Sequence, residues 1–460
     1  MGIEDLAART PSSRRRDLDL LRAVAIGAVV LGHWLIVTVE RTSDGRLTGF
    51  SALPELSSVH ALTWLFQVMP VFFLVGGVAN AISWTGRRTR GGTATSWLLD
   101  RSARLFPPVT ALLLVMAGGA AVARLAGVAP DVVAQAVALV ILPLWFLVVY
   151  LGVTALTPVT HRLHERHGPA VPVVLVAGVA VGDVLRLTTG NELAAAGSFA
   201  FGWLAIHQVG YAWHDGALRL GTRRAVTLVV VGLGTLVLLT GPGPYPVSMI
   251  TVPGAAIQNS APPTLALLVL AATQLGLVAL VARQAERWLA HPRAWAFVVA
   301  INTVVLTLYL WHMVAATVGA FALDMLGLLP PSDPGTVAWW LGRVPWLVTL
   351  GGILAVLVVL FGPVETRAPA RRAPTGAVVG ERRRAGAGLA AALARTGPVV
   401  GAYAAATAGL LWLTVAGDMG GLHGPFTVPT GALVLVLGSA AVLRFGRAGA
   451  RLGSAPEPSR

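Results

Sequence analysis

Long apolar stretches alternate along the chain with short segments that are rich in arginine, proline and glycine. Each stretch is close to the ~20 residues with which an α-helix crosses the hydrocarbon core of a bilayer. Because unpaired backbone groups are not tolerated in hydrocarbon, and because runs this long do not fit barrel strands, the pattern predicts an all-α polytopic transmembrane helix bundle. About twelve spans are expected, at residues 20–39, 61–84, 106–123, 133–158, 169–187, 194–213, 225–241, 263–282, 295–321, 337–361, 397–416 and 428–444.

The composition excludes a water-soluble fold. Of the 460 residues, 55% are hydrophobic and 12% are charged, whereas soluble domains carry about 25% charged residues. The sequence contains no cysteine, so disulfide bonds, thiolate catalysis and cysteine-ligated zinc or iron–sulfur centres are excluded. We expect no metal cofactor.

The basic residues indicate membrane topology. A net charge of +14 could suggest a nucleic-acid partner, but all 34 basic residues are arginine and most of them lie between the apolar stretches. With the N-terminus inside, 28 arginines fall in inner segments and five in outer segments, which is a strong positive-inside bias. Both termini are therefore predicted to be cytoplasmic, membrane lipids are expected as partners, and nucleic acid is not.

We expect a multi-pass protein of the inner, or cytoplasmic, cell membrane. The first apolar run follows Arg14-Arg15-Arg16, as in a secretory signal. It is longer than the apolar region of about 7–15 residues in such signals, and no small-residue cleavage site directly follows it, so we interpret it as a retained span. The composition, rich in alanine, valine and glycine and with arginine as its basic residue, resembles proteins of GC-rich bacterial genomes, so a bacterial source is expected.

The segments between spans divide the chain. A ten-span membrane domain at 17–362 is predicted between a cytoplasmic N-terminal tail at 1–16 and a cytoplasmic linker at 363–396 that is rich in Arg, Pro, Gly and Ala. Linker arginines of this kind contact anionic lipid headgroups. An additional pair of transmembrane helices follows at 397–446, and then a disordered C-terminal tail at 447–460.

The outer segment between the seventh and eighth spans is unusually long. It reads GPGPYPVSMITVPGAAIQNSAPP, which is uncharged and rich in proline and glycine. Such a loop can fold over the outer mouth of a helix bundle, or it can be an irregular connection. The sequence leaves both possibilities open.

The first span contains ionisable residues, which are costly inside a membrane and therefore need a partner, a cavity or a function. Asp19 and Arg22 lie near its inner end, and His33 follows Arg22 by eleven residues. At ~1.5 Å per residue, Arg22 and His33 are ~16 Å apart along the axis and cannot touch. At ~100° per residue, eleven steps give almost three turns plus ~20°, so both side chains face the same side of the helix, as a shared channel would require.

The ninth span repeats this pattern. Asn302, Tyr309, Trp311 and His312 gather on an otherwise apolar helix that is predicted to run from inside to outside, like the first span. His33 and His312 can therefore lie at a similar depth. Neutral imidazole suits general-base chemistry near neutral pH, although a structural hydrogen bond is the alternative for either histidine.

The inner loop between the second and third spans is rich in arginine and ends in RSARLFPP. Arg101 and Arg104 are three residues apart and adjoin the start of a helix, so they fall on one face and could hold a phosphate. The positive-inside rule alone explains most of the arginines in this loop.

Five segments between residues 17 and 361 resemble, in order, the motifs of the acyltransferase 3 family of membrane O-acyltransferases. DLLRAVAIGAVVLGH resembles its R-x10-H signature, and MPVFFLVGGVANAISW resembles its F-F-x-x-S-G element. RSARLFPP resembles its R-x-x-R-x-x-P loop, PLWFLVVYL its L-W-F-L segment, and YLWHM its Y-L-x-H element.

This resemblance implies O-acylation, in which an acetyl or other short acyl group moves from cytoplasmic acyl-CoA, such as acetyl-CoA, to a hydroxyl of a sugar, glycan, lipid or secondary metabolite. His33 would act as a catalytic base or as an acyl carrier, Arg22 as its partner on the same face, and Arg101 and Arg104 as ligands of donor phosphates. The predicted catalytic residues are His33, Arg22 and Asp19. The predicted donor- and substrate-binding residues are Arg101, Arg104, Trp145, Tyr309, His312 and Asn302.

The sequence also departs from the family pattern. Gly76 stands where many members have serine, and residues 147–150 offer no carboxylate where many glycan-acylating members have glutamate. A transporter or flippase without acyl-transfer chemistry is the alternative function, because twelve spans with both termini inside is also a common transporter architecture. The second half has no counterpart of the charged first span, and the Pro/Gly-interrupted segments do not pair as inverted repeats would.

Overall fold

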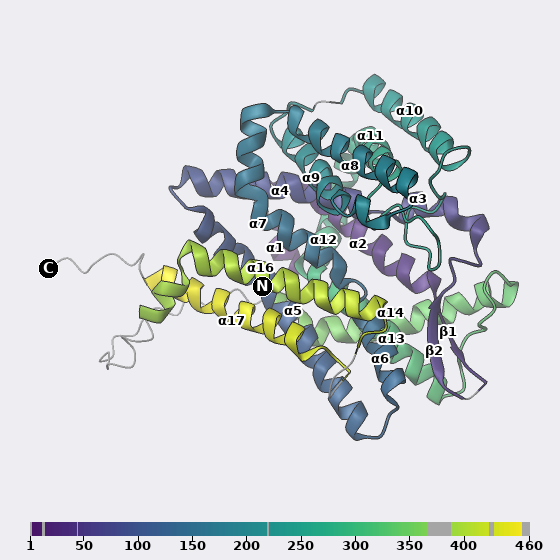
Figure 1. Ribbon diagram of the computed structural model, residues 1–460. Helices are drawn as coiled ribbons and strands as arrows, with labels where there is room; N and C mark the ends of the chain where they lie inside the picture. Colours follow the sequence, from purple (N-terminus) through teal and green to yellow (C-terminus); the bar gives the residue numbers. More distant parts are fainter. Residues whose placement is uncertain are drawn as a thin grey trace.

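The structure, a computed structural model, describes residues 2–11, 14–43, 45–218, 220–366, 388–422 and 427–452. This part of the chain is a bundle of helices with one two-stranded sheet (Figure 1), which confirms the predicted all-α polytopic bundle. The named elements are α1 (Ile3–Ala8), α2 (Arg16–Ile36), β1 (Val37–Arg41), β2 (Leu47–Ser51), η1 (Ser57–Leu62), α3 (Thr63–Phe66), α4 (Met69–Thr89), α5 (Ala94–Leu125), α6 (Pro130–Ile141), α7 (Leu144–His167), α8 (Ala170–Thr189), η2 (Glu192–Ala195), α9 (Ser198–His214), α10 (Thr222–Thr240), α11 (Leu265–Leu289), α12 (Pro292–Thr303), α13 (Val305–Met325), α14 (Val337–Thr366), α16 (Thr396–Asp418) and α17 (Thr430–Leu452).

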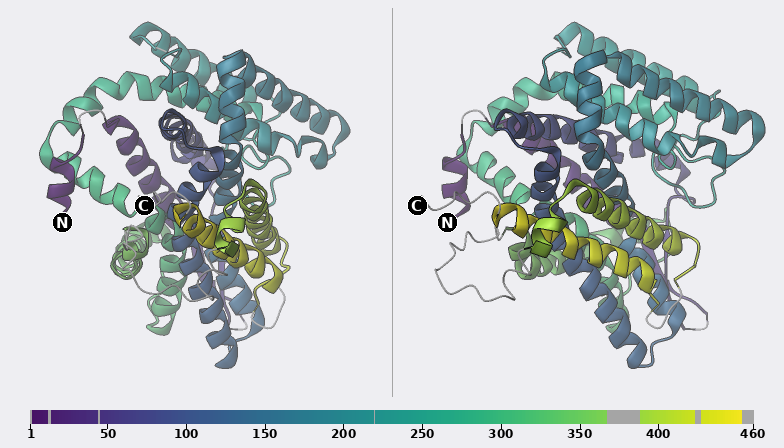
Figure 2. Two further views of the ribbon diagram at one scale, coloured as in Figure 1. Left: turned by 90° about the vertical axis from the view of Figure 1, so that its left-hand side faces the viewer. Right: turned by 60° about the vertical axis from the view of Figure 1, so that its left-hand side comes forward.

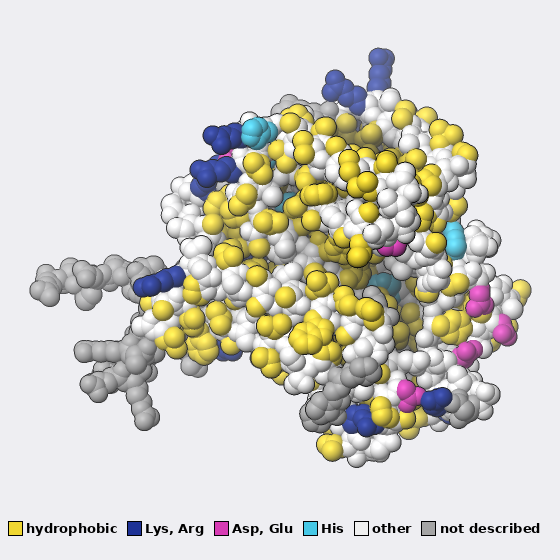
Figure 3. Space-filling view, in the orientation of Figure 1, with side chains coloured by type: hydrophobic (Ala, Val, Ile, Leu, Met, Phe, Trp, Pro, Cys, Tyr) yellow, Lys and Arg dark blue, Asp and Glu magenta, His cyan; other side chains and the backbone are white. Residues whose placement is uncertain are grey.

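Eleven helical segments in the described residues are long and apolar enough to cross a membrane, against twelve spans expected. The difference falls at 194–213, where the structure has the short helix η2 followed by α9, which is 17 residues long. Apolar side chains cover much of the visible surface, as a lipid-facing exterior requires, while arginines stand out at its left and top edges and acidic residues gather at its right (Figure 3). The chain is a multi-pass membrane protein.

Three predicted spans are not the single helices that the apolar pattern suggested. The span predicted at 133–158 is divided between α6 and α7 at Pro143, which has no N–H with which to continue the hydrogen-bond ladder of α6. The span predicted at 295–321 is divided between α12 and α13 at Val304. The span predicted at 61–84 is interrupted between α3 and α4, at residues 67–68.

Polar side chains stabilise two of these breaks. Glu365, near the end of α14, accepts hydrogen bonds from the backbone N–H groups of Leu306 (3.1 Å) and Thr307 (2.7 Å) in the first turn of α13. A carboxylate at this position also interacts favourably with the helix dipole. Gln67 accepts a 3.3 Å bond from the N–H of Met69 at the start of α4. Each interrupted helix thus regains partners for backbone groups that would otherwise be buried unpaired.

A β-hairpin replaces the end of the first predicted span. The helix ends at Ile36, and the β-branched run of residues 37–39 enters β1, which pairs antiparallel with β2. Gly45 supplies a positive φ of 81° in the connecting turn. From α14, Arg343 donates a 2.8 Å bond to the carbonyl oxygen of Val37, and the indole of Trp339 donates a 3.2 Å bond to the Thr38 hydroxyl.

The loop at 241–263 is held on the bundle. The N–H of Met249 donates to the Thr63 hydroxyl (2.8 Å), and its carbonyl oxygen accepts a bond from Gln67 Nε2 (2.6 Å). At the other side of the loop, Tyr245 donates a 2.8 Å bond to buried Asp183. Burial and this hydrogen bond raise the pKa of Tyr245 well above its usual range. The loop therefore folds over the interrupted second span, as one of the two alternatives proposed.

The C-terminal helix pair, α16 and α17, packs against α5, α6 and α7. In Figure 2 the yellow-green pair lies beside the blue helices in both views. The helix α14 extends to Thr366, and residues 367–387 of the predicted linker lie outside the described residues. The helix α17 continues to Leu452, six residues into the tail predicted at 447–460, and residues 453–460 also lie outside the described part.

Two glycines allow α4 and α9 to approach closely. A Cβ on Gly77 would lie 2.2 Å from the carbonyl oxygen of His207, and a Cβ on Gly210 would lie 2.3 Å from that of Leu74. Small residues permit this kind of backbone contact between membrane helices. The neighbouring atoms are backbone, so they cannot move away as a flexible side chain would.

We expect Gly77→Ala or Gly210→Ala to destabilise the protein by about 1–3 kcal/mol, since the added methyl group forces α4 and α9 apart. Reversible SDS unfolding of purified protein measures this change. Gly152→Ala in α7 is the control, because a Cβ there meets nothing within 4 Å and alanine is the better helix former. Unfolding of all three variants at the same SDS concentration would contradict the close-contact interpretation.

Candidate active site

The helix α2 carries His33 in its last turn, where the chain changes from helix to strand. The neighbouring Trp34 is buried, and its indole N–H donates a 2.9 Å bond to the carbonyl oxygen of His312 in α13. The carbonyl oxygen of Trp34 accepts a 2.9 Å bond from the indole of Trp346 in α14. These bonds fix the end of α2 against two other helices, so the direction of the His33 side chain is fixed with it.

His33 and His312 are in direct contact. His33 Nδ1 lies 2.8 Å from His312 Nε2, and the two rings are nearly parallel, with centroids 5.1 Å apart and planes 6° apart. His312 is fully buried, whereas His33 is partly exposed. The structure thus brings together two histidines that lie 279 residues apart in the sequence.

The hydrogen-bond partners determine the tautomers of this pair. His312 Nδ1 lies 2.6 Å from the carbonyl oxygen of Tyr309, which can only accept, so Nδ1 carries the proton of the neutral ring. His312 Nε2 is then an acceptor, and His33 Nδ1 must donate to it. His33 Nε2 consequently holds a free lone pair, and it has no hydrogen-bond partner among the described residues. This atom can act as a base or as a nucleophile.

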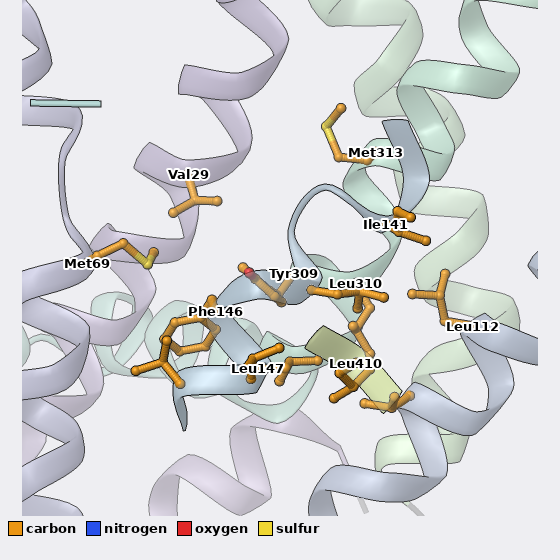
Figure 4. Packing of buried hydrophobic residues seen from close by; sticks show 14 of the residues in the cluster. Val29, Met69, Leu112, Ile141, Phe146, Leu147, Tyr309, Leu310, Met313 and Leu410 are labelled. Carbon is orange, nitrogen blue, oxygen red and sulfur yellow. The ribbon is translucent and has the colours of Figure 1, made fainter. Parts of the chain in front are cut away.

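Aromatic side chains surround the histidine pair. The Tyr309 ring lies 6.0 Å from that of His312 and 5.3 Å from that of Phe146, and the Tyr309 hydroxyl donates to the carbonyl oxygen of Pro143 at the break between α6 and α7. Figure 4 shows Phe146 and Tyr309 side by side. Trp145 packs against Phe146 and against the Trp203 ring, 5.9 Å away. Trp145 is therefore separated from the histidine pair by Phe146, and its ring contacts neither histidine.

Asp19 and Arg22 form a separate group at the start of α2. The Asp19 carboxylate is buried and accepts bonds from Arg14 (2.6 Å) and Arg22 (3.3 Å). The amide of Asn302 in α12 donates to the carbonyl oxygens of Asp19 (2.8 Å) and Val298 (2.9 Å). Because α2 is one continuous helix, Arg22 remains ~16 Å from His33 along the axis. The residues predicted as catalytic thus divide between the two ends of this helix.

Arg101 and Arg104 lie one turn apart on α5 and have different surroundings. Arg101 Nη2 donates to the carbonyl oxygen of Ala79 (3.1 Å) and to the Ser83 hydroxyl, and its guanidinium lies 5.2 Å from the Trp97 ring. The Arg104 side chain is exposed and has no ion-pair partner among the described residues. Arg101 is repelled by Arg104 and by Arg22. Arginines therefore outnumber carboxylates here, since Asp19 pairs with Arg22 and Asp100 pairs with Arg87.

A second polar cluster lies between α4, α7 and α9, and the sequence did not indicate it. His207 Nε2 is 3.2 Å from the Asn80 amide, and the Tyr211 ring packs against the rings of His161, His164 and His207. Gly76 adjoins this cluster, since a Cβ there would lie 3.9 Å from both His207 and Tyr150. In the described residues, no group of three or more His, Asp or Glu side chains could hold a metal ion.

The fold and the site define a class: a membrane-embedded helix bundle with a histidine pair, free at one ring nitrogen, at the end of its first span. The model of the acyltransferase domain family, acyltransferase 3, matches residues 15–362, about three quarters of the chain. The chain belongs to this family and is a membrane acyltransferase. No curated protein and no solved structure gave a significant match. The helix pair α16–α17 lies beyond the matched residues.

We expect His312→Ala to lower the turnover number for acyl transfer by about 10²-fold and to leave the donor KM nearly unchanged, because the variant removes the acceptor that fixes the His33 tautomer. His312→Gln should retain more activity, since its amide oxygen can accept the same proton. Steady-state kinetics of purified protein test both. His214→Gln, at the end of α9, controls for the loss of a histidine, and equal activity of His312→Ala and this control would refute the positioning role.

Proposed function

We propose that the protein transfers an acetyl or other short acyl group from cytoplasmic acyl-CoA to a hydroxyl group presented at the membrane. The observation that carries this proposal is the free lone pair of His33 Nε2, which the bond from His33 Nδ1 to His312 Nε2 leaves available. The family match supports the reaction class. The acceptor hydroxyl would belong to a sugar, glycan, lipid or secondary metabolite.

In a direct reaction, His33 Nε2 takes the proton of the acceptor hydroxyl while that oxygen attacks the thioester carbonyl. The tetrahedral intermediate then collapses, the ester forms and the C–S bond breaks. The departing thiolate receives the proton from His33. Because His312 Nε2 accepts from His33 Nδ1, it stabilises the positive charge that His33 carries between these two steps.

In a covalent reaction, His33 Nε2 attacks the thioester carbonyl and forms an acyl-imidazole, and the thiolate leaves. The acceptor hydroxyl then attacks this carbonyl, its proton passes to the released thiolate, and the C–N bond breaks to form the ester and restore the free histidine. His33 is partly exposed, which both reactions require. They differ in one observable, since the covalent reaction labels His33 when no acceptor is present.

We place the nucleotide of the donor at the arginine-rich end of the bundle, which we take to be cytoplasmic. Arg101 and Arg104 are close enough to repel each other, and the exposed Arg104 has no carboxylate partner among the described residues. Phosphate groups are the natural ligands of such arginines. The acyl group must then reach His33 along the face of α2 that starts at Arg22.

We expect His33→Ala to abolish acyl transfer, since both reactions use its Nε2 atom. Purified protein is assayed with acetyl-CoA and a panel of hydroxyl acceptors, and parallel samples with labelled acetyl-CoA and no acceptor are analysed by peptide mass spectrometry. Acetylation of the peptide containing His33 indicates the covalent reaction, and its absence indicates the direct one. Transfer by His33→Ala at the wild-type rate would overturn the proposed mechanism.

We expect Arg104→Gln to raise the acetyl-CoA KM about tenfold, because one charge-assisted contact with a phosphate is lost. Arg101→Gln should have a similar effect on KM and should also lower thermal stability, since it breaks the contacts with Ala79 and Ser83. Arg90→Gln, an exposed change at the end of α4, is the matched control for charge. An unchanged KM in both Arg101→Gln and Arg104→Gln would refute the phosphate assignment.

A further inference from the structure

The C-terminal helix pair brings an arginine to the donor end of the bundle. Arg447 lies near the end of α17, in a segment outside the residues that match the family. It faces α5, which carries Arg101 and Arg104. Two roles are open to Arg447: it can bind the donor, or it can act only as a positive charge that orients the last helix in the membrane.

The pair is fixed against α5. The Tyr403 hydroxyl of α16 donates a 2.9 Å bond to the carbonyl oxygen of Leu98, and its ring packs edge-on against Phe106. At the start of α5 and of α16, the hydroxyls of Thr95 and Thr396 are 2.8 Å apart. These contacts of α16 lie on either side of the Arg101–Arg104 turn of α5. The helix α17 packs against both α16 and α5, so it too has a defined position relative to that turn.

Arg447 is turned inward in a region of excess positive charge. Its side chain is 20% exposed, and Asp100 lies 3.5 Å from it and also 3.2 Å from Arg87. Arg447 is repelled by Arg104 and by Arg451, and its Nε atom is buried without a hydrogen-bond partner. One carboxylate is thus shared between two arginines, and Arg104 follows Asp100 by four residues on α5, so it lies on the same face of that helix, beside the contact with Arg447.

Membrane topology alone does not explain this arrangement. Arg444, one turn earlier on α17, is exposed, as expected of an arginine that contacts lipid headgroups. Arg447 instead packs towards α5, where a second arginine already lies, and the repulsion between them costs stability in the absence of an anion. A bound phosphate would relieve that repulsion and satisfy the free donor atoms of both guanidinium groups.

We propose that Arg104 of α5 and Arg447 of α17 together bind a phosphate group of the donor nucleotide, so that the C-terminal helix pair completes the donor site. This inference rests on the proposed function, because it takes acyl-CoA as the donor. It assigns a role to the two helices beyond the acyltransferase domain. It also predicts that the two arginines act as a unit on a single phosphate.

The test is a double-mutant cycle in neutral-lipid nanodiscs, with Arg104→Gln, Arg447→Gln and the double variant. Each single variant is expected to raise the acetyl-CoA KM about tenfold. The double variant should raise it by much less than the product of the two effects, because both residues bind one group. Arg447→Lys, which retains the charge and the pairing with Asp100, should recover part of the loss, and Arg444→Gln is the control on the same helix.

The same variants are also assayed with S-acetylpantetheine, which carries no phosphate, and in nanodiscs that contain anionic lipid. If the nucleotide is the ligand, Arg447→Gln has no effect on the KM for S-acetylpantetheine. A defect that is equal for both donors and appears only with anionic lipid would assign the phosphate to a headgroup and overturn the proposal. Additive effects in the cycle, or a KM for Arg447→Gln equal to that for Arg444→Gln, would also overturn it.

The experiments distinguish a wrong role for Arg447 from a wrong assignment of acyl-CoA as the donor. If wild-type protein neither binds acetyl-CoA nor transfers its acyl group, the donor assignment fails and the nucleotide site fails with it. If wild-type protein uses acetyl-CoA and depends on Arg104 but not on Arg447, only the role of the helix pair fails. Size-exclusion profiles and melting temperatures of each variant confirm that the changes in KM do not arise from misfolding.

Discussion

Every backbone N–H and C=O group within a membrane needs a partner in the protein, and the interruptions of this bundle depend on that constraint. The helix α13 begins after a break, yet Glu365 accepts two of its first N–H groups. Between α6 and α7, the carbonyl oxygen of Pro143 accepts a hydrogen bond from the Tyr309 hydroxyl. At these two breaks a distant element thus supplies a hydrogen-bond partner.

These interruptions also bring the residues of the candidate site together. His33 lies where α2 ends and β1 begins, Tyr309 and His312 lie in the first turns of α13, and Phe146 lies in the first turn of α7. A site assembled from helix ends can direct side chains and backbone carbonyls at one point, which three uninterrupted helices could not do. The carbonyl oxygen of Tyr309 illustrates this, because it sets the His312 tautomer and through it the free nitrogen of His33.

Much of the fold follows from the sequence, since the apolar runs report which segments enter the membrane and the arginines report where they leave it. The 3.6-residue period also placed Arg22 and His33 on one face. The breaks could not be predicted in the same way. Val304 sits in an apolar run, and Glu365, which accepts the N–H groups of Leu306 and Thr307 after this break, is about 60 positions away. The β-hairpin and the contact between His33 and His312 likewise depend on neighbours that no local pattern indicates.

The charged residues of α2 and the histidine pair lie at opposite ends of this helix. The start of α2 holds Asp19 and Arg22 near the arginines of α5, whereas the histidine pair lies at the other end of α2 among aromatic rings. An added element that packs on α5 therefore changes the charge at the start of α2 without disturbing the hydrogen bonds of His33. The helices α16 and α17 occupy this position, because Tyr403 contacts Leu98 and Arg447 contacts Asp100. Under the proposed function, recognition of the donor would diversify at one end of the bundle while the geometry of the histidine pair at the other end is kept.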